Sequence, residues 1–195
     1  MASGIHAIVL AAGRSSRFGR AKLLEELDGK SLVRRALETA QCACPGNTWL
    51  VTGHTANAIA DAAAGIADHI VYNPDYESGM GTSIASGVTA CSQQADAVVV
   101  MLADQALITE SHLSDLARSW SGDAGRIVAT AFSGTLGPPV LFGQDFFDEL
   151  RALDGDDGAK QLLRRHADAV RSIRFEPATT DIDTRGDLNR LINPE

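Results

Sequence analysis

Cysteine is scarce in this sequence of 195 residues, which contains only Cys42, Cys44 and Cys91. Two cysteines one residue apart, followed by a distant third, match neither a disulfide framework nor a zinc knuckle. We therefore expect all three to be reduced thiols in a cytoplasmic protein.

Long apolar runs and an excess of basic side chains are also missing. No run approaches the roughly 20 apolar residues of a membrane helix, and the N-terminus lacks the apolar segment of a signal peptide. The 25 acidic side chains outnumber the 17 basic ones, which gives a formal charge of −8. This charge disfavours a nucleic acid or an anionic membrane as a partner. We expect a soluble protein with no nucleic-acid partner and no membrane partner.

No Pro-, Ser- or Gly-rich linker, internal repeat or low-complexity tract divides the chain. A hydrophobic content of 45% over 195 residues is enough for one core of good size. We therefore expect one domain over residues 1–195.

Short apolar segments alternate with amphipathic helical stretches through most of the chain, which predicts a three-layer α/β/α fold. A turn at Ser133-Gly134-Thr135 leads directly into another strand, and so short a connection favours an antiparallel neighbour. The sheet should therefore be mixed but mostly parallel. Strands are expected over residues 5–10, 48–52, 69–72, 97–102, 127–132, 138–142 and 170–175. Helices are expected over residues 84–90, 145–150, 159–166 and 185–192, and after the possible caps Ser31 and Thr109.

A cationic loop follows the first apolar strand. The run Ile8-Val9-Leu10-Ala11-Ala12 stops at Gly13, and residues 14–22 then contain three arginines and one lysine. Gly13 and Gly19 allow close backbone approach, and free N–H groups beside this charge suit a polyphosphate. The spacing fits neither a Walker A loop nor a dinucleotide fingerprint. From spacing alone, a phosphate site and an ordinary basic turn both remain possible.

Ligands of open α/β sheets gather beyond the carboxyl ends of parallel strands. Residues 13–22, 53–55, 73–83 and 103–107 occupy such positions. Among them Asp104 follows a buried strand, where its carboxylate could bind Mg²⁺ together with substrate phosphates. The alternative is that Asp104 only caps the next helix, although Thr109 is a better candidate for that cap.

Two further segments offer polar groups. Asp181 and Asp183 flank Ile182. In an extended segment both carboxylates would point to the same side, where they could bind a metal. Alternatively, Asp183 or Thr184 caps the last helix, and Asp187 completes a capping box. Gly79-Met80-Gly81-Thr82-Ser83 has glycines that would admit a flat ring and hydroxyls that would contact it. An ordinary glycine turn with a Ser/Thr cap is the alternative.

Several motifs together resemble nucleotidyltransferases with a glycosyltransferase-A-like fold. Leu10-Ala11-Ala12-Gly13, Ser16-Arg17-Phe18-Gly19 and Lys22-Leu23-Leu24 are similar to the signature loop of these enzymes. Within them, the chain most resembles the molybdenum cofactor cytidylyltransferases. The resemblance continues through Gly79-Met80-Gly81-Thr82-Ser83, Ala103-Asp104-Gln105, Pro139-Val140-Leu141-Phe142, Gly155-Asp156-Asp157-Gly158-Ala159 and Asp181-Ile182-Asp183-Thr184.

The resemblance implies a nucleotide-diphospho-sugar transferase-like fold, with a nucleotide-binding half over about residues 1–108 and a substrate-side half over about 109–195. It implies transfer of CMP from CTP to the terminal phosphate of a molybdopterin-type cofactor, with Mg²⁺ or alternatively Mn²⁺, and an apo molybdenum hydroxylase as a possible client. The implied catalytic residues are Lys22, Arg17 and Asp104, and the implied metal ligands are Asp104 and Asp183. The implied nucleotide-binding residues are Leu10, Ala11, Ala12, Gly13, Arg14, Lys22, Gly81, Thr82 and Ser83.

Two positions depart from the family pattern, since Ala106 replaces a frequent proline and Pro138 a frequent histidine. Other activities on the same scaffold remain alternatives. These are guanylyl transfer to the same cofactor, nucleotidyl transfer to a sugar phosphate or an alcohol phosphate, and non-catalytic delivery of the cofactor by a chaperone.

Overall fold

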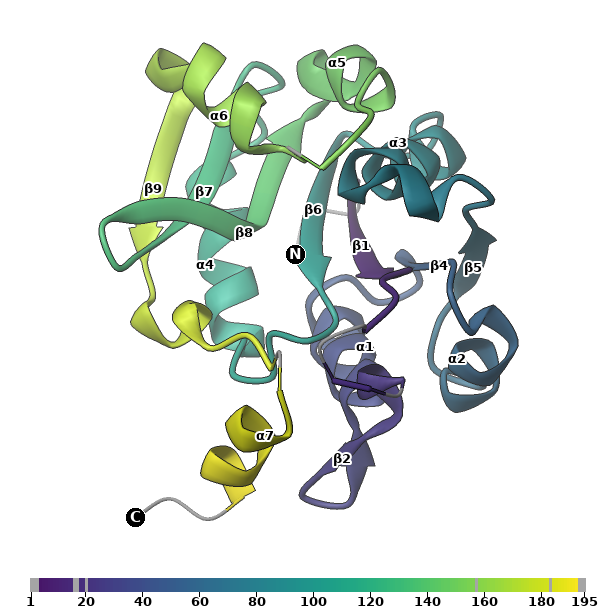
Figure 1. Ribbon diagram of the computed structural model, residues 1–195. Helices are drawn as coiled ribbons and strands as arrows, with labels where there is room; N and C mark the ends of the chain where they lie inside the picture. The colour runs from purple at the N-terminus through teal and green to yellow at the C-terminus, as the bar shows by residue number, and fades with distance from the viewer. Residues whose placement is uncertain (1–3, 16–17, 20, 157, 183, 193–195) are drawn as a thin grey trace.

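A seven-stranded mixed sheet forms the centre of the protein in the computed structural model, which describes residues 4–15, 18–19, 21–156, 158–182 and 184–192 (Figure 1). The strand order is β5-β4-β1-β6-β8-β7-β9. Only β8 runs antiparallel to its neighbours, so the predicted mixed, mostly parallel sheet is confirmed. The strands are β1 (Ile5–Ala11), β4 (Thr48–Thr52), β5 (His69–Tyr72), β6 (Ala97–Leu102), β7 (Ile127–Phe132), β8 (Thr135–Gly143) and β9 (Val170–Arg174). A separate two-stranded sheet pairs β2 (Glu26–Leu27) with β3 (Lys30–Ser31).

Helices cover both faces of the large sheet, as the three-layer prediction requires. One face carries α1 (Leu32–Ala43), α2 (Ala56–Ala62) and α4 (Glu110–Trp120). Helix α7 (Arg185–Ile192) packs against β2 below the large sheet, and its Leu188 joins the same core (Figure 1). The other face of the sheet carries α3 (Met80–Cys91), α5 (Phe147–Arg151) and α6 (Lys160–Arg165). Strand β1 is buried along its whole length, with Val9 in one core and Ile8 in the other. Continuous apolar strands of this kind are typical of parallel sheets covered on both faces.

The hairpin from β7 to β8 explains the single antiparallel strand. Ser133 and Gly134 form its two-residue turn, and their φ angles are +45° and +73°. Positive φ at both central residues gives the turn a twist that matches the flanking strands. The predicted turn and antiparallel pairing are therefore confirmed.

The predicted helix caps have mixed outcomes. Thr109 caps α4 as predicted, because its Oγ1 accepts a hydrogen bond from the His112 N–H at 3.2 Å. Ser31 stands at the N-cap of α1, but its side chain makes no capping hydrogen bond within the described chain. Thr184 and Asp187 form the reciprocal box at the start of α7: the Thr184 N–H donates to Asp187 Oδ2 at 2.7 Å, and the Asp187 N–H donates to Thr184 Oγ1 at 3.2 Å.

The cysteines are free thiols, as expected. Burial raises the pKa of Cys44 and of Cys91 to about 12, so both are protonated at neutral pH.

In the part of the chain that the structure describes, no helix combines the length and the apolar character needed to cross a membrane.

Helix α3 begins at Met80, four residues before the predicted start at residue 84. The glycines of this region serve backbone packing against residues 154–156. A Cβ on Gly81 would lie 2.5 Å from the Asp154 carbonyl oxygen, and one on Gly79 would lie 2.2 Å from the Gly155 carbonyl carbon. The Gly81 N–H also donates to the Gly155 carbonyl at 2.9 Å. The loop of residues 154–156 is therefore held against the first turn of α3.

We predict that Gly81→Ala lowers the free energy of unfolding by about 1–3 kcal/mol, because the added methyl group collides with backbone that cannot move independently. Gly186→Ala is the matched control, since its nearest neighbour would lie 3.5 Å away in ordinary contact. Alanine in α7 should be neutral or slightly stabilising. Urea unfolding of both variants measures the difference, and equal stabilities would refute the packing role of Gly81.

His112 is buried between α4 and the sheet. Its ring stacks on Phe175 with centroids 4.2 Å apart, and its Nε2 lies 2.8 Å from Thr130 Oγ1. The Thr130 hydroxyl donates its one hydrogen to the Pro139 carbonyl at 2.7 Å, so the His112 Nε2–H must be the donor in the bond to Thr130. Burial lowers the pKa of His112, although Asp115 partly opposes this shift.

This lowered pKa makes stability depend on pH. The unfolded chain takes up a proton on His112 near its ordinary pKa of about 6.5, before the folded protein does, so stability is lost as pH falls below that value. Between pH 7.5 and 5.5 we expect the free energy of unfolding to fall more in the wild type than in His112→Gln, because only the wild type has this unmatched proton uptake. Denaturant unfolding at both pH values is the measurement. An equal loss in the two proteins would contradict the prediction.

Candidate functional site

A cavity of about 390 Å³ lies at the carboxyl ends of β1 and β6. These strands are neighbours, with Leu10 paired to Leu102, and the Ala103 N–H donates to the Leu10 carbonyl at 3.1 Å. The loop after β1 and the loop after β6 therefore start side by side, as expected for adjacent parallel strands. Cavities of this size are common for small-molecule ligands. The lining residues are Leu10, Ala11, Ala12, Gly13, Arg14, Ser15, Lys22, Leu23, Tyr76, Glu77, Gly79, Met80, Ser83, Leu102, Asp104 and Asp156.

The most buried charges of the cavity form one ion pair. Lys22 Nζ lies 2.5 Å from Asp104 Oδ2, with 14% and 19% of the two side chains exposed. Lys22 opens a short 3-10 helix, Lys22–Leu24, and Asp104 follows β6 by two residues. Tertiary folding thus joins groups that are 82 residues apart in sequence. The two charges nearly cancel at the floor of the cavity. Each of them could instead pair with a ligand of opposite charge.

The second carboxylate oxygen of Asp104 bears on metal binding. Asp104 Oδ1 is buried and has no hydrogen-bond partner among the described residues. Leaving such an oxygen unsatisfied is unfavourable, and a cation would satisfy it. No group of three or more His, Cys, Asp or Glu side chains suited to a metal occurs within the described residues. The site therefore fits a cation held by one carboxylate and substrate phosphates better than a resident metal cage. Asp104 is not the cap of α4, because Thr109 fills that position.

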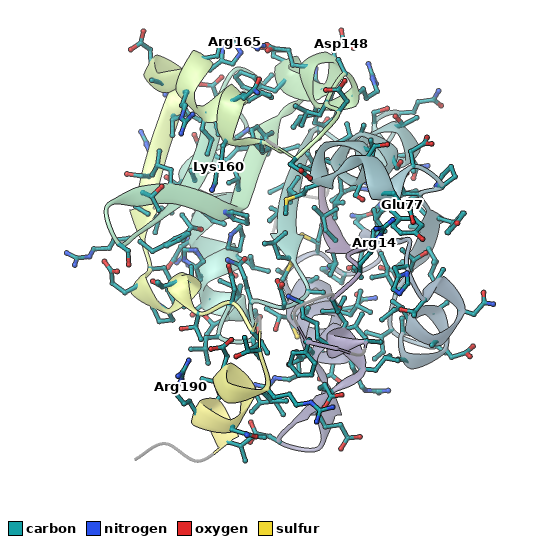
Figure 2. All side chains as sticks on the ribbon, viewed as in Figure 1. Arg14, Glu77, Asp148, Lys160, Arg165 and Arg190 are labelled. Carbon is teal, nitrogen blue, oxygen red and sulfur yellow. The ribbon has the colours of Figure 1, made fainter. Side chains whose placement is uncertain are left out.

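Arg14 and Glu77 form an ion pair at the mouth of the cavity, shown in Figure 2. Arg14 comes from the loop after β1, and Glu77 from the 3-10 helix Tyr76–Ser78. Both side chains are more than half exposed, at 54% and 59%. Exposed pairs contribute only about 0–1 kcal/mol, so a phosphate could readily draw Arg14 away from Glu77.

Thr82 and Ser83 differ in their access to the cavity, although a buried asparagine donates a hydrogen bond to both hydroxyls. Asn73 Nδ2 donates to Thr82 Oγ1 at 2.9 Å and to Ser83 Oγ at 3.0 Å. The Thr82 hydroxyl also lies 2.9 Å from the carbonyls of Asp75 and Gly79, so its hydrogen-bonding capacity is used within the protein. Ser83 is among the residues that line the cavity, whereas Gly81 and Thr82 are not.

The structure brings most of the sequence-predicted site residues together. Leu10 to Arg14, Lys22, Ser83 and Asp104 line the cavity. Arg17 and Asp183 lie outside the described residues. Ile182 directly precedes Asp183 in sequence, and its buried N–H donates to the Asp104 carbonyl at 3.2 Å.

Sequence reasoning singled out no side chain among Tyr76, Glu77, Met80 and Asp156, all of which line the cavity. Tyr76, Glu77 and Met80 do fall within residues 73–83, a segment that was predicted to contribute to a ligand site because it follows a strand. Asp156 reaches the cavity through the packing of its loop on α3, which has no local signal beyond the neighbouring glycines. Residues 53–55 do not line this cavity, although their strand position had suggested it. A Cβ on Gly53 would lie 2.6 Å from Tyr76 Cβ, so Gly53 supports the cavity wall from behind.

Known proteins resemble this chain over nearly its whole length. The purine catabolism protein PucB of Bacillus subtilis is 32% identical over 190 residues, which cover 91% of this chain and 90% of PucB. The nicotine blue oxidoreductase of Paenarthrobacter nicotinovorans is 32% identical over 196 residues, which cover 95% of each protein. Among solved structures, Rv0371c from Mycobacterium tuberculosis has a TM-score of 0.82 and 27% identity, with 98% of each chain covered.

The fold is that of nucleotide-diphospho-sugar transferases, and the structural neighbours include a nucleotidyl transferase from Methanothermobacter with a TM-score of 0.84 and 24% identity, over 96% of this chain and 95% of that one. Residues 7–170 match the family described as the MobA-like NTP transferase domain. This match spans the strands, the cation-rich loop and the Asp104 carboxylate that build the cavity. The chain therefore belongs to the MobA-like NTP transferase domain family.

Proposed function

We propose that this protein transfers CMP from CTP to the terminal phosphate of a molybdopterin-type cofactor, releasing pyrophosphate and forming the cytosine dinucleotide cofactor. The Lys22–Asp104 pair on the floor of the cavity carries the proposal, because it supplies a phosphate-binding cation beside a metal-binding carboxylate. Membership of an NTP transferase family supports a nucleoside triphosphate as the donor. The product would serve a molybdenum hydroxylase as its client.

The proposed reaction needs no protein base. A phosphate monoester carries a charge of about −1.5 to −2 at neutral pH, so the acceptor phosphate oxygen is itself the nucleophile. It forms a new bond to the α-phosphorus of CTP, while the bond from that phosphorus to the bridging oxygen of the β-phosphate breaks. This chemistry suits the described cavity lining, which includes no histidine. The protein contributes positioning and charge stabilisation.

Lys22 and Asp104 exchange partners in this scheme. Without substrate each compensates the charge of the other at 2.5 Å. With substrate bound, Lys22 would contact the triphosphate, and the Asp104 carboxylate would hold a divalent cation. Its chemistry there would be charge compensation for the α-phosphate and the departing pyrophosphate. Arg14 adds a second phosphate contact after leaving the exposed Glu77, and Arg17 is proposed as a third.

Mg²⁺ is the proposed cation, with Mn²⁺ as an alternative. The buried Asp104 Oδ1 without a described partner supports a cation at this position. A structure of Rv0371c in complex with manganese is 26% identical to this chain, with a TM-score of 0.79 over 98% of this chain and all of that one. Asp183 is proposed as a second ligand.

The cytosine base is proposed to contact backbone groups of residues 10–13 and the Ser83 hydroxyl, which all line the cavity. Thr82 and Gly81 then act by shaping the wall, because the Thr82 hydroxyl is already bonded within the protein. Guanylyl transfer, nucleotidyl transfer to a sugar phosphate or an alcohol phosphate, and cofactor delivery without catalysis are the alternatives.

We expect CTP to be preferred over GTP by at least a hundredfold in kcat/KM. A site that hydrogen-bonds one base leaves buried polar groups unpaired with the other, at about 1–3 kcal/mol for each group. The test incubates the protein with Mg²⁺, molybdenum cofactor and each nucleoside triphosphate in turn, and identifies the dinucleotide by mass spectrometry. Preference for GTP would replace the cytidylyl assignment, and absence of any dinucleotide would refute nucleotidyl transfer to this acceptor.

Asp104→Asn should lower kcat at least tenfold in a protein that remains folded. Asparagine retains an oxygen that can accept the Lys22 hydrogen bond, but it loses the negative charge that binds a cation. Loss of one charge-assisted contact corresponds to about 1.5–3 kcal/mol in the transition state. Asp61→Asn on the exposed surface of α2 is the matched control and should behave as wild type. Full activity in Asp104→Asn would remove this carboxylate from the mechanism.

A further inference from the structure

A second cavity, of about 680 Å³, lies between α6 and the sheet beside the hairpin that joins β7 to β8. Its apolar surface comes from Ala131 and Leu136 on the sheet and from Leu163 on α6. The hydroxyl-bearing residues Thr135 and Ser172 lie at the same cavity. The cavity thus combines a surface suited to a flat ring with groups that can donate hydrogen bonds.

The charged residues of this cavity are mainly basic, on a chain whose formal charge is −8. Lys160, Arg164 and Arg174 contribute three positive charges, and Glu176 contributes the one negative charge. Arg174 donates to Glu176 at 2.9 Å, so these two compensate each other. The excess of two positive charges therefore resides on Lys160 and Arg164.

Lys160 and Arg164 lie four residues apart on α6 and therefore share one face of the helix. Neither side chain has a hydrogen bond or ion pair with any described residue, unlike Arg165 beside them, which pairs with Glu149. Two other helical arginines are also paired with a nearby acid, Arg118 with Asp115 and Arg151 with Asp148. Two neighbouring cations without a counterion, over a concave surface, favour an anionic ligand.

The two cavities open at the same edge of the sheet. Strand β7 is antiparallel to β8, which is antiparallel to β6, so β7 and β6 end at the same edge. Asp156 lines the first cavity and Lys160 the second, and four residues of chain span at most about 14 Å. Figure 2 shows Lys160 at α6, extending toward the sheet. One acceptor molecule can therefore reach from the first cavity into the second.

We propose that this second cavity binds the end of the acceptor substrate that is remote from its reacting phosphate, and that this end is a ring system bearing negative charge. The inference rests on the proposed function. Lys160 and Arg164 provide the compensating charge, while Ala131, Leu136 and Leu163 contact the ring. A pterin that carries two thiolate sulfurs has this chemistry, whereas the uncharged hydroxyls of a sugar phosphate do not.

The test compares Lys160→Gln, Arg164→Gln and their double variant with Arg165→Gln, which removes one charge from the same helix outside the cavity. Binding of molybdenum cofactor without CTP is measured by equilibrium titration, and KM is measured separately for cofactor and for CTP. We expect the double variant to raise Kd and KM for the cofactor at least tenfold, and to change KM for CTP less than twofold. Arg165→Gln should change none of these values more than twofold.

Two further measurements separate charge from structure. Lys160→Arg should keep the wild-type Kd, and added salt should weaken cofactor binding more in the wild type than in the double variant. Wild-type cofactor affinity in the double variant, with CMP transfer intact, would overturn the second-cavity inference and leave the proposed function standing. A wild-type protein that binds CTP but neither binds the cofactor nor forms a dinucleotide would overturn the proposed function and this inference with it.

Discussion

The parallel pairing of β1 with β6 is the constraint on which the candidate site depends. Because Leu10 and Leu102 are partners in the register, the loop that contains Lys22 and the turn that contains Asp104 begin at the same height on the sheet. A shift of this register would move Asp104 away from Lys22 and would turn the apolar side chains of one strand to the opposite face. The buried strands on both sides oppose such a shift, since β1 is buried over its full length. The hydrophobic core therefore positions the charged groups.

Charge compensation distinguishes the parts of the site. Lys22 and Asp104 form a largely buried ion pair, whereas Arg14 and Glu77 form an exposed one. Each described cation that lines the first cavity therefore has an acidic partner within the protein until a ligand competes for it. Burying two charges costs desolvation free energy, and their attraction offsets this cost only partly. A buried ion pair therefore adds little to the stability of the fold, which suggests that this pair has another role. Lys160 and Arg164 contrast with both pairs, because no described residue compensates them.

The glycines of residues 79–81 connect the two ends of the proposed acceptor path. By admitting the backbone of residues 154–156, they attach the segment that leads into α6 to the helix that lines the first cavity. A side chain at either glycine would separate the backbone of residues 154–156 from the first turn of α3. The same contact explains why Gly81 is important even though it does not line the first cavity.

Local sequence determined most of the fold: strands β4, β5, β6 and β7 have the predicted bounds, and the β7–β8 hairpin and the Thr109 cap were predicted correctly. Apolar runs, turn residues and caps act over a few neighbouring residues, so their effect can be read directly from the chain. The sequence also indicated Lys22 and Asp104 as candidate site residues, in the segments that follow two of the strands. Tertiary structure alone decided that these two side chains pair, that Thr82 turns its hydroxyl toward Asp75 and Gly79, and that α3 begins at Met80. These outcomes depend on contacts between segments distant in sequence, such as Gly81 with Gly155, which local composition does not encode.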